Sequence, residues 1–119
     1  MLLFFVYLFI HEAQIAGQCT GPIFLTTQAE VNAFSCVGTF TGDLFVDDAM
    51  SGSITDLSTL HTLTSIDGDL FVSDNSALIN VDGLSGLTTV TGNLFILRNA
   101  SLANVGGLWH HQFSFPRNN

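Results

Sequence analysis

A repeated strand motif is the feature that most constrains this chain of 119 residues. Three segments share the pattern glycine, aspartate or asparagine, leucine, phenylalanine and a β-branched residue: 42–46, 68–72 and 92–96. Their first residues lie 26 and 24 positions apart. The flanks repeat too, since Asn75 matches Asn99 and Gly83 matches Gly107. A period of this length is typical of proteins in which small units stack along one axis.

The composition of each unit predicts how it folds. Leucine, phenylalanine and valine or isoleucine in the motif favour a short strand. Apolar residues then recur at every third position, which suits tight turns or 3₁₀-like segments better than a long helix: Leu78, Val81, Leu84, Leu87 and Val90. One unit cannot bury this apolar side alone, so neighbouring units should pair their strands in parallel. We expect a mainly β fold, a short parallel β-solenoid. Glycines should allow positive φ at its corners, and Asn75 and Asn99 should bind backbone groups of adjacent turns.

A small helical cap is expected before the first motif. Thr27 and Glu30 have the spacing of a capping box, with Thr27 as the N-cap. A helix over 28–34 would present Val31 and Phe34 to the end of the stack. Such a cap would cover a strand edge that could otherwise pair with another chain.

The pattern L-x-V/I-x-x-N-x-x-L-x-x-V-x-G-L resembles the leucine-rich repeat. Together with the GDLFV strands and the upstream cysteines, it looks most like the receptor L domain of insulin-receptor and epidermal-growth-factor-receptor ectodomains. The resemblance covers about residues 36–108. It departs from the usual repeat in having Asn-x-x-Leu in place of Asn-x-Leu, and it lacks later repeats and a C-terminal cysteine cap. The resemblance implies a right-handed solenoid with a binding role outside the cell.

The first 17 residues are typical of a secretory signal peptide. An apolar run covers residues 2–10, too short to span a bilayer, and small residues follow at Ala13, Ala16 and Gly17. Neither lysine nor arginine precedes the run, and the alternatives are an uncleaved anchor or a buried strand. The expected organisation is a signal peptide at 1–17, an N-terminal cap at 18–38, repeats at 39–108 and a tail at 109–119.

The two cysteines of the chain, Cys19 and Cys36, are predicted to form a disulfide. They lie 17 positions apart, and a secreted chain meets an oxidising compartment. Closing a loop of this size stabilises a fold by roughly 3 kcal/mol. The alternative is a pair of buried free thiols.

The tail at 109–119 matches no position of the repeat. Two interpretations are open for it. In one, Trp109, Phe113 and Phe115 fold over the last repeat as a cap. In the other, the chain is a fragment of a longer repeat protein.

Strand parity supplies the candidate ligand-binding residues. If the leucines and β-branched residues of the motif face the core, Phe45, Phe71 and Phe95 form an outward ladder with steps of about 4.8 Å. Asp43, Asp69 and Asn93 would run beside it. Such a stripe could stack on sugar rings or seat a protein. The alternatives are a purely structural ladder and the reversed parity, with the phenylalanines buried.

Charge excludes several classes of partner. The chain has ten acidic residues against two basic ones and a net charge of −8. Nucleic acids and anionic membranes require clustered lysine or arginine, so neither is an expected partner. Membrane contact is expected only through the first segment, if it is retained.

Motifs for catalysis and cofactors are also lacking. The sequence has no nucleophile elbow, zinc-protease or paired-acid signature, and we expect no cofactor. Calcium is an alternative at the oxygen ligands that follow the strands, although no calcium-loop motif is present: Asp47, Asp48, Asp74 and Asn75. Asn99 begins an N-glycosylation sequon, which matters only in a eukaryotic host.

The sequence thus predicts a non-enzymatic binding module that is secreted or displayed at the cell surface, with a protein or carbohydrate ligand. One alternative is a structural repeat fragment of a larger adhesin or receptor ectodomain. A remote alternative is a β-helix polysaccharide-active enzyme, which would need Arg98 to stabilise a developing anion.

Overall fold

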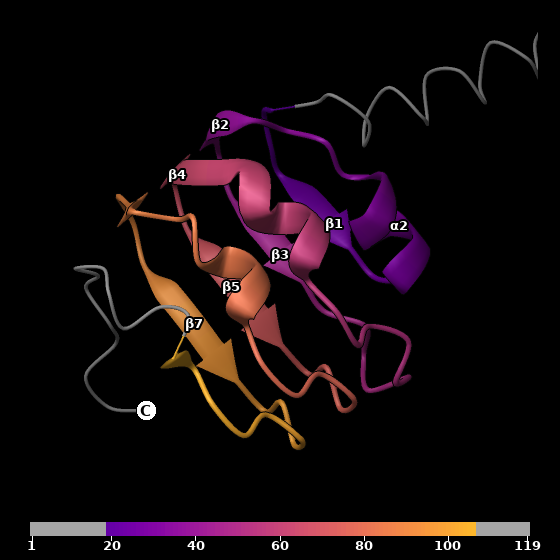
Figure 1. The fold of residues 1–119 in the computed structure, drawn as a ribbon. Helices are drawn as coiled ribbons and strands as arrows, with labels where there is room; N and C mark the ends of the chain where they lie inside the picture. The colour runs from indigo at the N-terminus through magenta and orange to yellow at the C-terminus, as the bar shows by residue number, and fades with distance from the viewer. Residues whose placement is uncertain (1–18, 107–119) are drawn as a thin grey trace, which may run out of the picture.

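The computed structural model describes residues 19–106, which are mainly β (Figure 1). Seven strands, one α-helix and two 3₁₀-helices follow one another in this part of the chain. In chain order they are β1 (Ile23–Leu25), α2 (Gln28–Ala33), β2 (Gly38–Thr41), β3 (Leu44–Val46), η1 (Ser58–Thr62), β4 (Leu63–Asp67), β5 (Leu70–Ser73), η2 (Asp82–Leu84), β6 (Thr89–Val90) and β7 (Leu94–Leu97). The expected signal peptide at 1–17 and the tail at 109–119 lie outside the described residues.

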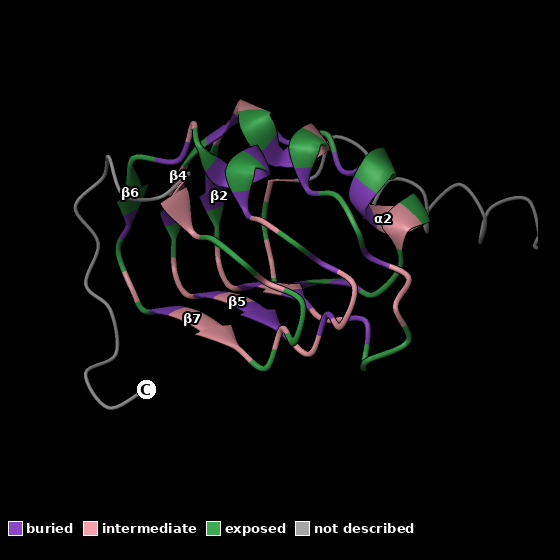
Figure 2. Ribbon diagram, turned by 60° about the horizontal axis from the view of Figure 1, so that its bottom comes forward, coloured by how far each residue is buried: buried purple, intermediate pink, exposed green. Residues whose placement is uncertain are grey.

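The strands form two parallel sheets. The four-stranded sheet has the order β1-β3-β5-β7, and the three-stranded sheet has the order β2-β4-β6. In the four-stranded sheet Leu44 pairs with Leu70 and Leu70 with Leu94, so the repeated motifs lie in register. Figure 2 shows the two sheets along two sides of the molecule, with α2 and the 3₁₀-helices along a third.

Each repeat contributes two strands, whereas the sequence predicted one. The additional strands form the three-stranded sheet, in which Phe40, Ile66 and Val90 point inward between polar residues. The overlooked signal is the alternation T-F-T, S-I-D and T-V-T, a half-buried strand pattern in β-branched residues.

The apolar residues of both sheets and the 3₁₀-helices meet in one core. The fully buried set includes Leu44, Leu70 and Leu94 from the strand motifs and Leu60 and Leu84 from the helical side. The expected 3₁₀ segments are therefore confirmed, and the apolar residues that recur at every third position from Leu78 to Val90 all face inward.

Glycines form a column at the corner between the sheets. Gly42 and Gly68 have positive φ, as the sequence suggested. The column also requires close packing, because a Cβ on Gly68 would overlap the carbonyl of Gly42, and one on Gly92 would overlap that of Gly68. Gly21, which precedes β1, lies against Gly42 and extends the column by one position.

Buried side-chain amides link the repeats at the carboxyl ends of the strands of the four-stranded sheet. Asn75 is fully buried, and its Nδ2 donates to the carbonyl of Val46 at 2.9 Å and to Asn99 Oδ1 at 3.0 Å. Its Oδ1 accepts from the N–H of Asp48 at 3.0 Å. Asn99 repeats the pattern, accepting from the N–H of Asn75 and donating to Val72. These bonds confirm the role expected for both asparagines.

Asp48 holds the first position of this amide series. Its backbone N–H donates to Asn75 Oδ1, in the same way that the N–H of Asn75 donates to Asn99 Oδ1. Asp48 is buried, and its Oδ2 accepts from Ile54, while Oδ1 has no partner within residues 19–106. A carboxylate cannot donate to the preceding strand as an amide does, so the series ends here.

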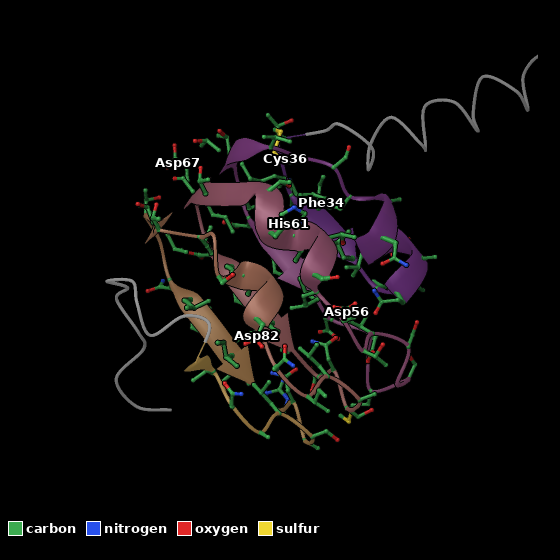
Figure 3. All side chains as sticks on the ribbon, viewed as in Figure 1. Phe34, Cys36, Asp56, His61, Asp67 and Asp82 are labelled. Carbon is green, nitrogen blue, oxygen red and sulfur yellow. A yellow bond between two sulfur atoms is a disulfide. The ribbon has the colours of Figure 1, made fainter. Side chains whose placement is uncertain are left out.

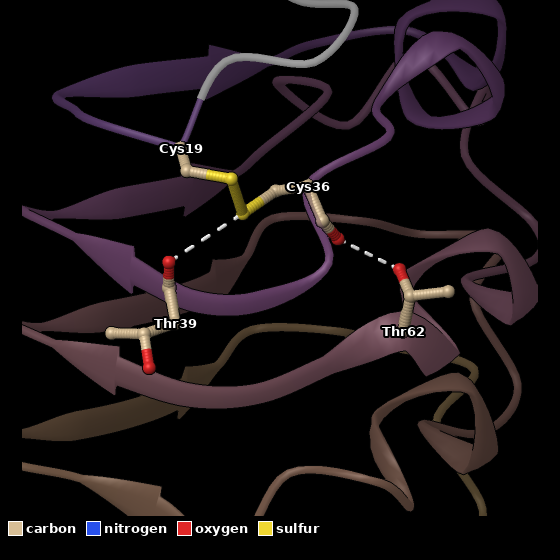
Figure 4. Close-up of a disulfide and its surroundings, with 4 residues drawn as sticks. All are labelled: Cys19, Cys36, Thr39 and Thr62. Atoms are coloured by element: carbon tan, nitrogen blue, oxygen red, sulfur yellow. Dashed lines mark hydrogen bonds between the residues drawn. A yellow bond between two sulfur atoms is a disulfide. The ribbon is translucent and has the colours of Figure 1, made fainter.

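The N-terminal part joins the sheets through a disulfide between Cys19 and Cys36 (Figure 4). The two Cα atoms lie 5.2 Å apart, and the predicted pairing is confirmed. The Thr62 hydroxyl donates to the Cys36 carbonyl at 2.7 Å, and the Cys36 sulfur lies 3.7 Å from the Thr39 carbonyl oxygen. The bridge thus fixes the segment before β2 to the segment before β1.

The helical cap is present but short. Thr27 is the N-cap of α2, and its hydroxyl accepts from the N–H of Glu30 at 3.1 Å. Glu30 departs from a standard capping box, because its Oε1 accepts from the N–H and hydroxyl of Thr26. The helix ends at Ala33, one residue before the predicted end, since Phe34 adopts an extended conformation. No helix within residues 19–106 is long and apolar enough to cross a membrane.

Replacing the side-chain nitrogen of one buried asparagine by oxygen should have a large effect on stability. Asn75→Asp removes both side-chain donations and places a carboxylate oxygen against two acceptors, so it should lower the free energy of unfolding by roughly 3 kcal/mol or more. Urea unfolding followed by circular dichroism measures this value. Asn93→Asp is the control, because Asn93 is exposed and should change stability by less than about 1 kcal/mol. Equal effects at the two positions would contradict the role given to Asn75.

Candidate ligand-binding face

Four phenylalanine rings form a stacked column on the outer face of the four-stranded sheet. The ring centroids of Phe24, Phe45, Phe71 and Phe95 lie 4.6 Å apart at each step, with interplanar angles of 11°, 5° and 10°. The leucine and valine neighbours of these rings are buried, whereas Phe24 is 58% exposed and Phe45, Phe71 and Phe95 are half-buried. The parity predicted for Phe45, Phe71 and Phe95 is therefore the one observed. We call these four residues the phenylalanine ladder.

Phe24 was missed by the sequence analysis. Its strand, Ile23–Leu25, lacks the glycine–aspartate start of the other motifs. In-register pairing with β3 nevertheless places Phe24 opposite Phe45. The usable signal was the alternation I-F-L directly after Gly21 and Pro22.

Stacking decides which parts of the rings a ligand could touch. Phe45 and Phe71 each have a neighbour on both faces, so these rings offer only their edges to solvent. A sugar stacks on the face of a ring. Within residues 19–106, faces without a ring neighbour remain only on the outer sides of Phe24 and Phe95. Along the middle of the ladder a partner would meet ring edges, which carry partial positive charge.

The acidic file beside the ladder takes part in the fold. Asp43 Oδ1 accepts from the N–H of Asp69 at 2.8 Å, and Asp69 Oδ1 accepts from the N–H of Asn93 at 2.7 Å. Asp43, Asp69 and Asn93 thus lie together along the ladder as predicted, and the two carboxylates satisfy backbone donors of the next repeat. Oδ2 of Asp43 and Oδ2 of Asp69 take part in neither of these two bonds.

A second file follows the other ends of the strands. In-register pairing brings Ser73 beside Leu97, and the Ser73 hydroxyl contacts Asp47 Oδ2 at 3.3 Å. Asp47 Oδ1 accepts from the N–H of Ala49 at 2.8 Å. This side of the ladder therefore has one carboxylate, that of Asp47, followed by a hydroxyl and an apolar side chain.

Arg98 is the one lysine or arginine among residues 19–106, and it is paired. Its Nε and Nη2 donate to the two oxygens of Asp74 at 2.7 and 2.9 Å. These bonds hold the pKa of Asp74 below its ordinary value and raise that of Arg98. The arginine side chain is 64% exposed, so the pair adds little stability in water.

Titratable side chains do not gather at one point. Within the described part of the chain, no three His, Cys, Asp or Glu residues are placed to hold a metal ion. Figure 3 shows Asp56, Asp67, Asp82 and His61 at separate places on the surface. His61 Nδ1 lies 2.8 Å from the carbonyl of Ser58 in its own 3₁₀-helix. Asp48, one of the residues considered for calcium, is buried in the amide series.

The sequon at Asn99 coincides with the amide series. The Nδ2 atom that would carry a glycan donates to the carbonyl of Val72 at 2.8 Å. Asn99 Oδ1 accepts two bonds from Asn75. The side chain therefore already has a structural task.

Comparison with protein-family models, with curated proteins and with solved structures finds no match to this chain. The functional interpretation therefore rests on the sequence pattern and on the geometry of the four-stranded sheet.

Ring stacking should contribute measurably to stability. Phe71→Leu removes a ring with two stacked neighbours and should lower the free energy of unfolding by about 1–3 kcal/mol beyond the loss of apolar area. Phe24→Leu removes one stacked contact and should cost about half as much. Urea unfolding of both variants gives the comparison. A smaller loss at Phe71 than at Phe24 would show that stacking between repeats is not the stabilising interaction.

The Arg98–Asp74 pair makes a pH-dependent contribution. The folded pKa of Asp74 lies below its ordinary value of 3.8, so the stabilisation is present above that value and is lost as the pH falls through the folded pKa. Arg98→Met should raise the Asp74 pKa, because it removes both hydrogen bonds and the positive charge. A carboxyl NMR titration of the two proteins measures the shift. An unchanged titration would show that the pair does not form in solution.

Proposed function

We propose that the chain is a short right-handed β-solenoid of the leucine-rich-repeat or receptor-L-domain type, acting as a non-enzymatic recognition module outside the cell. The parallel in-register strands support the solenoid, and the disulfide is consistent with an extracellular location. The first 17 residues would direct secretion. The ligand would bind the outer face of the four-stranded sheet.

The phenylalanine ladder is the observation that carries this proposal. A soluble protein usually buries large aromatic side chains, whereas here Phe24 is exposed and the edges of the half-buried Phe45, Phe71 and Phe95 form a continuous stripe beside it. Three steps of 4.6 Å give the ladder a length of about 14 Å, enough to contact several groups of one partner. The strands below hold the rings in fixed positions, so binding would cost little side-chain entropy.

Ring edges favour a protein partner over a stacked sugar in the middle of the ladder. Backbone carbonyl oxygens and aromatic faces complement the positive edges of Phe45 and Phe71. Carbohydrate could stack only at Phe24 or Phe95, where one ring face lacks a ring neighbour. We therefore place a protein ligand first and a glycan second.

A structural role is the second candidate, because the ladder itself joins the repeats. In this case the chain would be a repeat segment of a larger adhesin or receptor ectodomain without its own ligand. A polysaccharide-active enzyme has less support, since Arg98 is engaged by Asp74.

Tyrosine substitutions test the binding face without dismantling the ladder. Phe45→Tyr, Phe71→Tyr and Phe95→Tyr in one chain keep the rings and add three hydroxyl groups at their outer edges. Tetramers of the wild type and this triple variant would be tested on cultured cells and on immobilised glycans. We expect binding by the wild type and at least about tenfold weaker binding by the variant, equivalent to about 1.4 kcal/mol.

Matched controls separate a local effect from a general one. Thr39→Tyr with Thr89→Tyr places hydroxylated rings at exposed positions of the three-stranded sheet and should leave binding unchanged. Circular dichroism checks that all proteins are folded. Equal binding by the wild type and the triple variant would rule out the ladder as the ligand site. A folded wild type that binds none of the probes would favour the structural role.

A further inference from the structure

The two edges of the four-stranded sheet complement each other, and we propose that the protein associates head to tail with a second copy of itself. In this arrangement β1 of one copy pairs in parallel with β7 of another, and Phe24 stacks on Phe95. The proposal concerns the two ends of the ladder. It is independent of a protein ligand on the outer face, but it would cover the ring faces of Phe24 and Phe95 on which a glycan could stack.

Backbone groups at the β7 edge are directed toward a further strand. In each repeat the first strand residue donates its N–H to the backbone carbonyl of the residue that precedes the next strand of the sheet: Ile23 to Asp43, Leu44 to Asp69 and Leu70 to Asn93. Leu94 holds the same position in β7, so its N–H points away from β5. Among residues 19–106 there is no strand on this side of β7.

The β1 edge has the matching groups. Ile23 and Leu25 direct their bonds toward β3, through the N–H of Ile23 and the carbonyl of Leu25. Because alternate residues of a strand direct their backbone groups to opposite sides, the N–H and carbonyl of Phe24 face away from β3. The ring of Phe24 is 58% exposed, and its one ring partner among the described residues is Phe45.

The side-chain bonds of the acidic file do not continue across this junction. Within the chain, each carboxylate of the file accepts the N–H of the equivalent residue in the next repeat. The position before β1 that corresponds to Asp43 is Pro22, which has no N–H. The last residue of the file is the neutral Asn93, so the missing bond leaves no carboxylate without a partner at the junction.

The direction of association follows from the strand edges and not from charge. Arg98, which follows β7 directly, already donates to both oxygens of Asp74 in its own chain. In a parallel pair, only the β1 edge of one copy against the β7 edge of another continues the order of the four-stranded sheet.

A head-to-tail contact leaves one free edge at each end of every assembly, so the association is open and depends on concentration. Sedimentation velocity of the full secreted chain over a range of concentrations should show an average mass that rises with concentration. Phe24→Asp should weaken association at least tenfold. Ile79→Asp is the matched control, because Ile79 is 56% exposed and belongs to neither β1 nor β7, and it should behave as the wild type.

Cross-linking tests the register. Phe24→Cys and Phe95→Cys proteins, mixed with a short dithiol-reactive cross-linker, should give the mixed dimer, whereas each protein alone should give little dimer. A wild type that stays monomeric at the highest concentration, including through coverage of β7 by its own tail, would overturn the proposal. Self-dimers of Phe24→Cys, or equal weakening by Ile79→Asp, would also overturn it.

Discussion

Parallel pairing in register is the constraint on which this structure depends. The strands contain two to five residues, and none of them could remain ordered without a neighbour. Each repeat therefore obtains its hydrogen-bond partners from the repeats beside it. Because the register aligns equivalent residues, glycine lies against glycine, asparagine against asparagine and phenylalanine against phenylalanine.

The same alignment creates a problem for acidic residues. Register places Asp43 beside Asp69 within a chain of net charge −8. Binding of each carboxylate to a backbone N–H of the next repeat reduces this cost, because the donor offsets part of the negative charge. The file therefore links neighbouring repeats although two of its three members carry negative charge. On the other side of the strands, Ser73 takes the place of a second aspartate beside Asp47.

The repeat let the sequence predict the parallel strands, their registered phenylalanines, the 3₁₀ segments and the roles of Asn75 and Asn99, because these follow from period and parity. Composition and spacing likewise predicted the disulfide between Cys19 and Cys36. Features that break the period were missed. Phe24 belongs to a strand without the motif. Asp48 joins the amide series one position out of step, because it lies two residues after Val46, whereas Asn75 and Asn99 lie three residues after their strand counterparts Val72 and Ile96.

The candidate site was predictable in its residues but not in its orientation. Strand parity indicated which residues face outward, yet parity contains no information about ring rotation. The 4.6 Å spacing, which is close to the distance between paired strands, forces neighbouring rings to lie face to face. This stacking turns the ring edges outward, which strand parity alone could not have predicted.

The position of the Asn99 amide has a consequence for the order of events during biosynthesis. In a eukaryotic secretory pathway, oligosaccharide would be transferred to the same Nδ2 that binds Val72 in the folded protein. The transferase requires this nitrogen to be accessible, whereas the folded last repeat holds it against the neighbouring strand. In such a host, docking of that repeat and glycan transfer would compete for one atom, and the faster process would determine whether Asn99 carries a glycan.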